Sequence, residues 1–379
     1  MTVAAAAVRN ATKVGDLDTP TVLVDVNKLQ ANLARMADRV AAAGDGRVRL
    51  RPHGKTHKTR EIAQRQLALG AIGLTVAKVG EAEAMVGAGV EDLLIAYPVL
   101  GDLKYQRLLP LLNRARIRIA IDSLDVAEAA SAFFARHGVR LPVLIEIDTG
   151  FGRTGVQSPA EALQLADQID ELPGVEVAGV MCFGGEAYQT DDPAKQAEIG
   201  HAEGELSVQV ADLVGTHRHG VGTVSVGSTP TAVAAAGVKG VTEVRPGVYA
   251  FGDLKQVQLG TARLEDCALT VLATVVSHPR PERYVVDAGL KAFAGENYGW
   301  GTYGRLLEHS DLIVDWAAEE HGVILVPEGS RDPGLKIGDK VRIVPDHACG
   351  TVNMHDELVA VDGDLVVDVW PVIGRGRVR

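Results

Sequence analysis

Residues 51–58, with the sequence RPHGKTHK, hold the densest group of reactive side chains in the chain. They directly follow a predicted strand that begins near Val48. A lysine in a cationic, partly desolvated setting has its neutral amine favoured, and that form makes a Schiff base with an aldehyde cofactor. Taken alone, the segment fits a solvated basic loop equally well, because runs of charge are usually exposed.

Two glycine-containing segments could line a binding site. Residues 226–231, VGSTPT, offer a glycine for close approach and hydroxyl groups beside it, which are features that a phosphate site needs. Residues 148–155, DTGFGRTG, place Arg153 among glycines after a predicted strand at 141–147. Each segment by itself is also typical of an ordinary turn, and Arg153 would then be a surface side chain.

A further segment, residues 345–353 with the sequence PDHACGTVN, could hold a metal ion. It follows a predicted strand at 340–344, and in an extended segment residues i and i+2 point to the same side, so His347 and Cys349 could share one ion. Two protein ligands leave positions open for water or substrate, which suits a catalytic site. On chemistry alone, a buried structural cysteine beside a surface histidine is the better interpretation.

The elements that must position these residues follow a regular pattern. From about residue 20 to 250, short β-branched runs alternate with amphipathic stretches, which is typical of βα units around a parallel sheet. After a lead-in strand at 21–26, eight such units predict a TIM-type (β/α)8 barrel, with chemistry at the carboxyl ends of the strands; a doubly wound open sheet is the alternative. The eight strands are predicted to begin near residues 48, 72, 92, 118, 142, 176, 223 and 243.

Past about residue 255 the pattern changes to strand-like runs with little helix between them. We therefore predict an α/β chain of two domains, a barrel at 20–253 and a mainly β domain at 254–379, with residues 1–19 packing with the second. The strand-like runs are 268–277, 284–287, 340–344, 358–361 and 364–369.

Composition excludes several classes of function. A net charge of −11, 4% aromatic residues and the lack of a basic stripe argue against a nucleic-acid partner. No apolar run is long enough to span a membrane, and residues 1–18 lack a signal-peptide pattern, so we expect a cytoplasmic protein with no membrane partner. Cys182, Cys267 and Cys349 are few and widely spaced, which fits a reducing compartment.

Taken together, these segments resemble the D-serine dehydratase and D-threonine aldolase family, fold-type III enzymes related to alanine racemase that use pyridoxal 5′-phosphate (PLP). The resemblance runs from about residue 18 to the end and includes Thr19-Pro20, the stretch AKVGEAE at 77–83 and RPHGKTHK. It implies that Lys55 binds the cofactor as a Schiff base. It also implies that His57 and Arg153 are catalytic, with Arg153 near the cofactor's phenolic oxygen.

The same resemblance implies further cofactor contacts. Ser228 and Thr229 would bind the phosphate, and the segment RPGVY at 245–249 resembles a racemase segment whose backbone N–H groups face the same group. Whether Arg245 holds the pyridine nitrogen stays open. The cofactor contacts expected in addition to Lys55 and Arg153 are Ser228, Thr229, Gly247, Val248 and Tyr249.

For the metal, His347-x-Cys349 matches the dehydratases of the family, whereas many of the aldolases carry His-x-Asp. The resemblance therefore implies a divalent ion held by these two residues, with zinc first and manganese or magnesium as alternatives, because thiolate favours zinc-like ions. Glu320 and His321 are candidates to orient the metal, its water or the substrate.

The implied activity is that of a lyase on 3-hydroxy-D-amino acids, first a D-serine dehydratase-like reaction that gives a keto acid and ammonia. The alternative is D-threonine aldolase-like cleavage to glycine and an aldehyde, since NMHD at 353–356 looks closer to the aldolase pattern, while Gly350 departs from both groups. More distant alternatives are an amino-acid racemase, which would need no metal, and a non-catalytic PLP carrier, which would lack the β domain. The resemblance also implies a homodimer.

Overall fold

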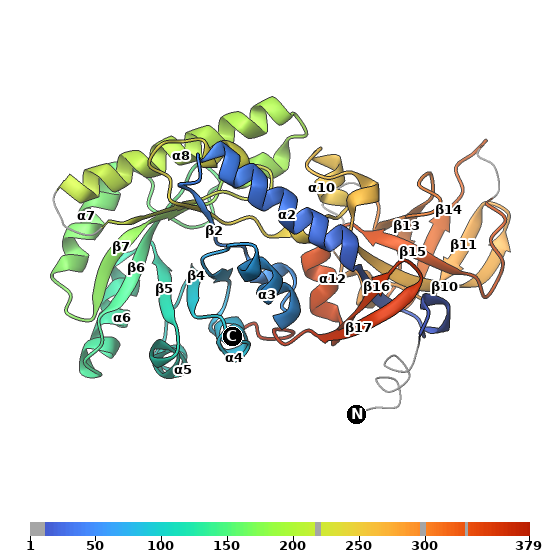
Figure 1. Cartoon of the computed structure of the whole chain (residues 1–379), viewed down its shortest axis with the longest axis horizontal. Helices are drawn as coiled ribbons and strands as arrows, with labels where there is room; N and C mark the ends of the chain where they lie inside the picture. The colour runs from blue at the N-terminus through green and yellow to red at the C-terminus, as the bar shows by residue number, and fades with distance from the viewer. Residues whose placement is uncertain (1–11, 217–220, 296–300, 330–332) are drawn as a thin grey trace. The chain divides into compact units, whose positions relative to one another are not determined.

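The computed structural model describes residues 12–216, 221–295, 301–329 and 333–379, and the chain divides into two compact units (Figure 1). We call Ala34–Lys55, Ile62–Gly247 and Gly376–Arg379 the barrel unit. Met1–Leu33, Thr56–Glu61 and Val248–Arg375 are the β unit. Each unit is built from segments that are separate in sequence. The sequence analysis placed one domain boundary between residues 253 and 254, and that boundary stays a prediction.

Eight parallel strands form the sheet of the barrel unit, in the order β2-β9-β8-β7-β6-β5-β4-β3. The first and last strands of this order are β2 and β3. A parallel bridge between His53, just after β2, and Thr75 in β3 connects these two edges of the sheet. All eight predicted strands are present, which confirms the βα pattern. The strands are β2 (Arg49–Leu50), β3 (Leu74–Val76), β4 (Asp92–Pro98), β5 (Arg116–Ile121), β6 (Leu141–Ile147), β7 (Val175–Cys182), β8 (Thr223–Val226) and β9 (Glu243–Val244).

Helices alternate with these strands along the chain, as Figure 1 shows for β4 to β7. The sequence starts them with ordinary signals. Before α7, for example, Ser158 accepts the backbone N–H of Glu161, and Pro159 occupies the first turn, where no N–H partner is needed. The helices are α2 (Val26–Ala43), α3 (Arg60–Ala68), α4 (Val79–Gly87), α5 (Asp102–Leu108), α6 (Leu124–Arg136), α7 (Pro159–Asp170), α8 (Pro193–Thr216) and α9 (Ala232–Ala236).

Side chains alternate between the two faces of each barrel strand, and apolar side chains on the inner face fill the interior of the barrel. Leu94, Ala120, Leu144 and Met181, one from each of β4 to β7, form a buried cluster. Because successive residues of a strand face opposite sides, the neighbours of these residues meet the helices instead. The near-continuous burial of β4 and β6 is what parallel strands covered on both faces require.

The β unit contains a nine-stranded sheet in the order β11-β14-β13-β12-β15-β10-β1-β16-β17. Every neighbouring pair is antiparallel except β1 with β16, and β10 also pairs with β11. The strands are β1 (Thr21–Asp25), β10 (Leu269–Arg280), β11 (Arg283–Val286), β12 (Gly304–Leu306), β13 (Ile313–Ala317), β14 (Gly322–Leu325), β15 (Lys340–Pro345), β16 (Glu357–Asp362) and β17 (Leu365–Pro371). Its helices are α10 (Leu254–Gln258), α11 (Leu290–Phe293) and α12 (Ala348–Met354).

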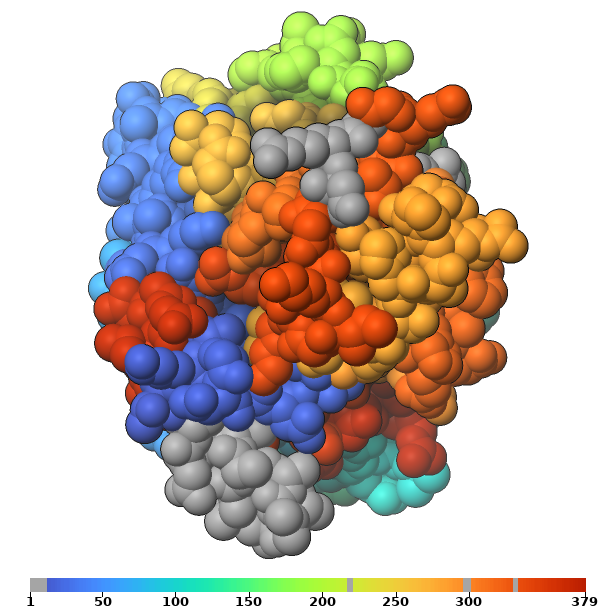
Figure 2. Space-filling model, turned by 90° about the vertical axis from the view of Figure 1, so that its right-hand side faces the viewer, coloured from blue at the N-terminus to red at the C-terminus, as the bar shows by residue number. Residues whose placement is uncertain are grey.

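The lead-in strand belongs to this sheet, and the described residues before it, 12–20, pack with it. Leu23 pairs with Thr270 on β10 and with Val359 on β16. Val14 donates its backbone N–H to Asp364 at 2.9 Å, and Figure 2 shows the blue N-terminal residues against a red C-terminal group. A core of Val14, Leu17, Leu23, Leu272, Val359 and Val361 holds these segments together.

The five predicted strands of the C-terminal region are all present, but β12, β13 and β14 lie between residues 304 and 325, where no strand was predicted. They are only three to five residues long, so their apolar pattern is too short to recognise, and they form because they pair with one another and with β11 and β15. No helix in the described ranges is both long enough and apolar enough to cross a membrane.

Candidate active site

Lys55 lies in the loop that leaves the carboxyl end of β2, in a short 3-10 turn at Gly54–Thr56. The backbone N–H of His53 donates to the carbonyl of Pro246 at 2.9 Å, and Thr75 donates its N–H to Pro52 at 2.8 Å. The loop is therefore held between the segment after β9 and strand β3. This places the half-buried Lys55 at the catalytic end of a parallel barrel.

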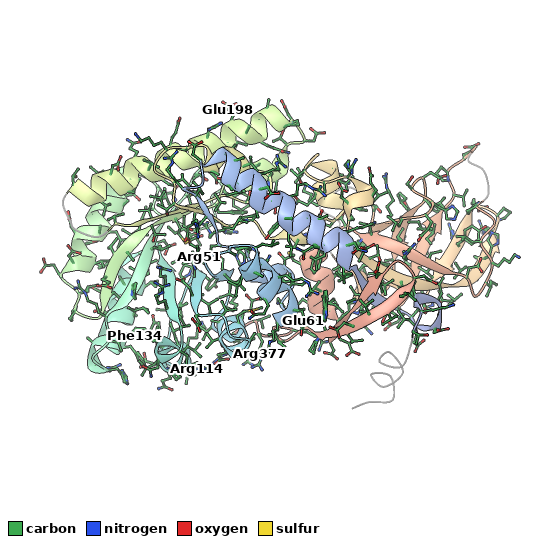
Figure 3. The ribbon with its side chains drawn as sticks, in the orientation of Figure 1. Arg51, Glu61, Arg114, Phe134, Glu198 and Arg377 are labelled. Atoms are coloured by element: carbon green, nitrogen blue, oxygen red, sulfur yellow. The ribbon has the colours of Figure 1, made fainter. Side chains whose placement is uncertain are left out.

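Arg51, the first residue of the motif, forms buried ion pairs that hold the structure together. It donates to Glu243 on β9 at 2.8 Å and to Asp92 on β4 at 2.5 Å, and its side chain is 2% exposed (Figure 3). A Cβ on Gly73 would come within 2.7 Å of its guanidinium. A buried cation paired with one carboxylate from β9 and one from β4 fixes the start of the loop, so this part of the motif's charge is structural.

His57, predicted to be catalytic, is fully buried in the β unit. Its Nδ1 accepts the backbone N–H of Thr59 at 3.1 Å. A ring nitrogen that accepts a hydrogen bond carries no proton, so the neutral imidazole holds its proton on Nε2. His57 therefore has a fixed tautomer with Nε2 as a donor.

Arg153 lies where β6 and β7 end. Its guanidinium stands 4.7 Å from the ring centroid of Phe183 and 3.9 Å from the Glu146 carboxylate, and the side chain is 52% exposed. The loop around it is tied by Asp148, which accepts the N–H groups of Gly150 and Gly152. Cation–π contact with Phe183 gives the guanidinium a defined position at the carboxyl end of the barrel, unlike a free surface arginine.

The predicted phosphate residues follow the next strands of the barrel. Ser228 and Thr229, after β8, are 3% and 7% exposed, and Gly227 has a φ of 87°, which favours glycine. Ser228 donates its backbone N–H to the Thr231 hydroxyl at 2.9 Å. Gly247 follows β9, and the next residues, Val248 and Tyr249, form a buried 3-10 turn.

Arg245, whose role stayed open, points into the barrel. It donates to the Ser225 hydroxyl at 2.7 Å and to the carbonyl of Cys182. It is buried, and burial lowers the pKa of its guanidinium, an effect that nearby Glu243, Glu203 and Glu146 oppose. Arg245 is thus a fixed cation under the carboxyl ends of β7 and β8.

The predicted metal pair lies in the β unit, directly after β15. His347 is the N-cap residue of α12, and Cys349 lies in the first turn of that helix. Their side chains are within hydrogen-bond reach of each other. Burial lowers the pKa of His347, but the neighbouring Cys349 and Asp253 outweigh this effect and raise the pKa well above its usual value.

The segment that carries this pair was predicted to be extended. The structure shows a helix from Ala348 to Met354 instead. The argument from i and i+2 in a strand was therefore wrong. The two side chains meet because His347 keeps extended backbone angles (φ −137°, ψ 113°) while the chain turns into the helix immediately after it. Local sequence gives no strong helix signal here, since Gly350, Thr351 and Val352 are weak helix formers.

Asp253 orients the histidine. One carboxylate oxygen, Oδ2, accepts the His347 Nδ1–H at 3.1 Å and the Ala348 N–H at 3.0 Å, while Oδ1 caps α10 through Gln256 N–H at 2.9 Å. Asp253 is completely buried. A carboxylate that holds Nδ1–H leaves Nε2 as the nitrogen that can bind an ion once it gives up its proton, which is the arrangement found behind metal-binding histidines. From the sequence alone, Asp253 could support a site residue or simply be a turn residue after Phe251-Gly252.

Two further contacts run along the same face of α12. The Thr56 hydroxyl lies 3.4 Å from the Cys349 sulfur, and one turn later Lys58 donates to the Asn353 side-chain oxygen at 2.7 Å. Lys58 has a φ of 53°, an unusual conformation for a residue with a side chain. The second half of the RPHGKTHK motif is thus packed against the predicted metal helix.

Within the described residues, no group of three or more His, Cys, Asp and Glu side chains could hold a metal ion. The pair His347 and Cys349 would therefore leave positions on an ion open.

Glu320 forms an ion pair with Lys291 at the surface, and His321 is exposed beside it. Cys182 and Cys267 are buried, and burial raises the pKa of both thiols, as expected of packing residues.

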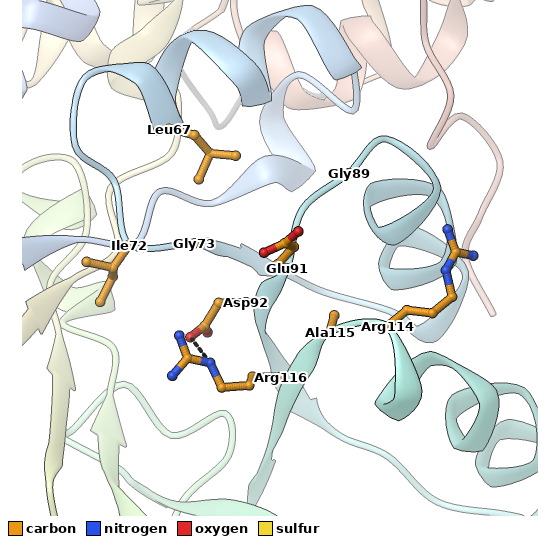
Figure 4. A pocket seen from close by; sticks show the side chains of 9 residues that line it. All are labelled: Leu67, Ile72, Gly73, Gly89, Glu91, Asp92, Arg114, Ala115 and Arg116. Carbon is orange, nitrogen blue, oxygen red and sulfur yellow. Dashed lines mark ion pairs between the residues drawn. The ribbon is translucent and has the colours of Figure 1, made fainter.

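A pocket of about 510 Å³ lies at the amino-terminal ends of β4 and β5 (Figure 4). Asp92 in its lining pairs with Arg116 at 3.4 Å and with Arg118 at 2.9 Å, in addition to Arg51. The predicted catalytic residues follow the carboxyl ends of the strands, which is the opposite end of a parallel barrel. This pocket is therefore separate from the predicted site.

Comparison with known proteins gives the family. The model "Alanine racemase, N-terminal domain" matches residues 24–255, and "Putative serine dehydratase domain" matches residues 268–361. A D-threonine aldolase of Arthrobacter sp. is 36% identical over 367 residues, 96% of this chain and 94% of that protein. The chain belongs to the D-serine dehydratase and D-threonine aldolase family of PLP-dependent enzymes.

Other members are similar in sequence and fold. A D-threo-3-hydroxyaspartate dehydratase of Delftia sp. (strain HT23) is 35% identical over 372 residues, 93% of this chain and 97% of that protein. A crystal structure of a D-threonine aldolase from Filomicrobium marinum superposes with a TM-score of 0.89 at 30% identity, covering 97% of this chain and 98% of that one. These relatives are lyases of D-hydroxyamino acids, and this chain is a lyase of the same kind.

Two solved variants of a D-threo-3-hydroxyaspartate dehydratase also match. One replaces a cysteine by alanine and is in a metal-free form, with a TM-score of 0.88, 34% identity and coverage of 95% of this chain and 99% of that one. The other replaces a histidine by alanine, with a TM-score of 0.87, 33% identity and coverage of 97% and 98%. The two substituted positions are two residues apart.

Proposed function

We propose that this family member is a dehydratase that removes the hydroxyl group of a 3-hydroxy-D-amino acid, with PLP and a zinc ion bound, and releases a keto acid and ammonia. The observation that carries the proposal is the pairing of His347 with Cys349, with the imidazole oriented by Asp253. Imidazole and thiolate together favour zinc-like ions over magnesium or manganese.

The residues present fit the cofactor. Lys55, Arg153 and Ser228 all follow carboxyl ends of strands of one parallel sheet, β2, β6 and β8, so they gather at one end of it. The buried hydroxyls of Ser228 and Thr229, next to a glycine with positive φ, suit a phosphate. We assign phosphate contacts to Ser228, Thr229, Gly247, Val248 and Tyr249, and the aldehyde to Lys55.

The residues present also fit a metal ion. His347 can offer Nε2, once that nitrogen gives up its proton, and Cys349 can offer its sulfur, and two ligands leave open positions for water or substrate. In the related D-threo-3-hydroxyaspartate dehydratase, the substituted cysteine and histidine have the same spacing, and the cysteine variant is metal-free. This supports His347 and Cys349 as the ligands here.

When bound, PLP supplies an electron sink for the substrate Cα, and the metal supplies a Lewis acid for the 3-hydroxyl group. The chain's own residues do the rest. The Lys55 amine takes the proton from Cα. The Arg153 guanidinium would stabilise negative charge on the cofactor's phenolate oxygen, and His57 would act as a hydrogen-bond donor through its Nε2–H.

The second candidate is retro-aldol cleavage to glycine and an aldehyde. It is favoured by the identity of 36% to the Arthrobacter D-threonine aldolase, which is as high as the identity to the dehydratase. Both reactions use the same residues, so overall similarity does not separate them. The His-x-Cys pair is the feature that places the dehydratase first.

Product analysis tests the proposal. Purified protein is offered D-serine, D-threonine and 3-hydroxy-D-aspartate, with chelator, with zinc and with manganese. We expect keto acid and ammonia, lost with chelator and restored by zinc. Glycine and an aldehyde would establish the aldolase instead, and no product from any of the substrates would refute both. The homodimer and the cytoplasmic location stay predictions.

A further inference from the structure

Glu203 is a buried carboxylate that the proposed mechanism does not use. It lies on α8, and 1% of its surface is exposed. The Thr231 hydroxyl and the backbone N–H groups of Gly184 and Gly227 lie near enough to its carboxylate to act on its pKa and lower it. These donors belong to the loops that follow β7 and β8. One side chain therefore ties together two loops at the carboxyl ends of the barrel strands.

Glycines make room for this arrangement. A Cβ on Gly184 would overlap the Glu203 carboxylate. A Cβ on Gly200 would lie 2.8 Å from the carbonyl oxygen of Thr231, and one on Gly204 would lie 2.8 Å from the Val238 side chain. Side chains at these positions would push α8 and the loops apart, so the close approach of Glu203 is built into the local sequence.

The two oxygens of Glu203 differ. Oε1 has no hydrogen-bond partner among the described residues, whereas Oε2 faces the Cys182 thiol. Burial raises the pKa of Glu203 to about 7, although Thr231 and Arg245 act to lower it. Besides Arg245, the Cys182 thiol is a titratable group near Glu203, with its sulfur 4.0 Å from Oε2. Near neutral pH the group is therefore partly protonated, and it places less negative charge near a bound phosphate than an ordinary glutamate would.

The hydrogen bonds continue from Glu203 to a predicted phosphate residue. The Thr231 hydroxyl lies near Glu203 and acts on the pKa of its carboxylate, and it accepts the backbone N–H of Ser228 at 2.9 Å. The hydroxyl oxygens of Ser228 and Thr231 lie 3.0 Å apart. The position of Ser228 thus depends on Thr231, and that of Thr231 depends on Glu203.

We propose that Glu203 is a positioning residue for the cofactor's phosphate, because it holds residues 227–231 in the conformation that presents Ser228 and Thr229. The inference rests on the proposed function, since it takes the phosphate of PLP as the group bound there. Glu203 does not touch the cofactor itself. Its contribution is the fixed shape of the loop, which a flexible chain would have to order on binding.

The experiment compares PLP with pyridoxal, which lacks the phosphate. Apoenzyme is titrated with each compound, and the dissociation constants are read from absorbance. In Glu203→Met, a side chain of similar length removes the carboxylate that faces Thr231, Gly184 and Gly227, and we expect PLP affinity to fall by about tenfold or more. Pyridoxal affinity should stay within about threefold, because it does not depend on the loop.

Glu203→Gln separates hydrogen bonding from packing. Its amide oxygen can replace Oε2 as the acceptor, so PLP affinity should stay within about threefold of the wild type. Thr231→Val removes the link to Ser228 and should lower PLP affinity selectively, which decides the matter if the methionine variant does not fold. Glu198→Met, at an exposed position of the same helix (Figure 3), is the matched control and should bind both compounds normally.

Unchanged PLP affinity in folded Glu203→Met and in Thr231→Val would overturn the inference. So would an equal loss of PLP and pyridoxal affinity, because that result would mean general damage to the site. A wild-type protein that binds PLP no better than pyridoxal would instead refute the phosphate site of the proposed function, so the two failures are distinguishable.

Discussion

Replacing Asp253 by asparagine should weaken metal binding without disturbing the fold. The aspartate is fully buried, and its Oδ2 accepts both His347 Nδ1–H and Ala348 N–H, while Oδ1 caps α10. Asparagine has the same shape but only one acceptor oxygen. If that oxygen keeps the cap on α10, the amide N–H₂ faces His347 and Ala348.

The consequence is a change of tautomer. An amide donor opposite Nδ1 makes this nitrogen an acceptor and moves the imidazole proton to Nε2, the nitrogen that would bind the ion. The Ala348 N–H loses its acceptor as well, which costs about 1–3 kcal/mol. Changes in such partners typically reduce metal affinity by about 10- to 100-fold. That range corresponds to about 1.4–2.7 kcal/mol.

The assay is zinc binding in competition with a chromophoric chelator, with thermal unfolding and the visible cofactor absorbance measured in parallel. Asp315→Asn, at an exposed position of the same unit, is the control and should behave as the wild type. Zinc affinity in Asp253→Asn equal to that of the wild type would refute the reasoning, because the carboxylate would then have no part in orienting His347.

Three other predictions concern Lys55, Cys349 and Glu203. Lys55→Ala should abolish the visible absorbance of the bound cofactor, and a retained, borohydride-reducible chromophore would mean that another lysine binds it. Cys349→Ala should lose zinc and turnover but keep the cofactor absorbance, whereas Cys267→Ala, a packing residue, should keep both. Burial raises the pKa of Glu203 from 4.5 to about 7, so the folded state keeps a proton that the unfolded chain loses; this stabilisation is complete below about pH 4.5 and is lost as the pH rises through about 7. Urea unfolding should therefore show the wild type losing up to about 3 kcal/mol relative to Glu203→Gln between pH 5 and 8, and parallel pH profiles of the two proteins would contradict this.

Much of the architecture could be predicted from local sequence. The βα alternation placed all eight strands of the barrel sheet, because each strand is a separate apolar run with its own helix after it. The same pattern indicated that the segments carrying Lys55, Arg153 and Ser228 follow the carboxyl ends of strands. In a parallel sheet those ends meet at one edge, so candidate residues far apart in sequence could be grouped before their positions were known.

The tertiary structure alone decided the features that depend on partners remote in sequence. Thr21–Asp25 reads as a strand, but only its pairing with β10 and β16 shows that it belongs to the β unit. The short strands β12 to β14 and helix α12 have weak local signals and form because their neighbours complete them. Asp253 and His347 are 94 residues apart, so no spacing could have paired them. A hydrogen bond of this kind depends on the positions of two chain segments in the folded protein, and local residue preferences cannot predict those positions.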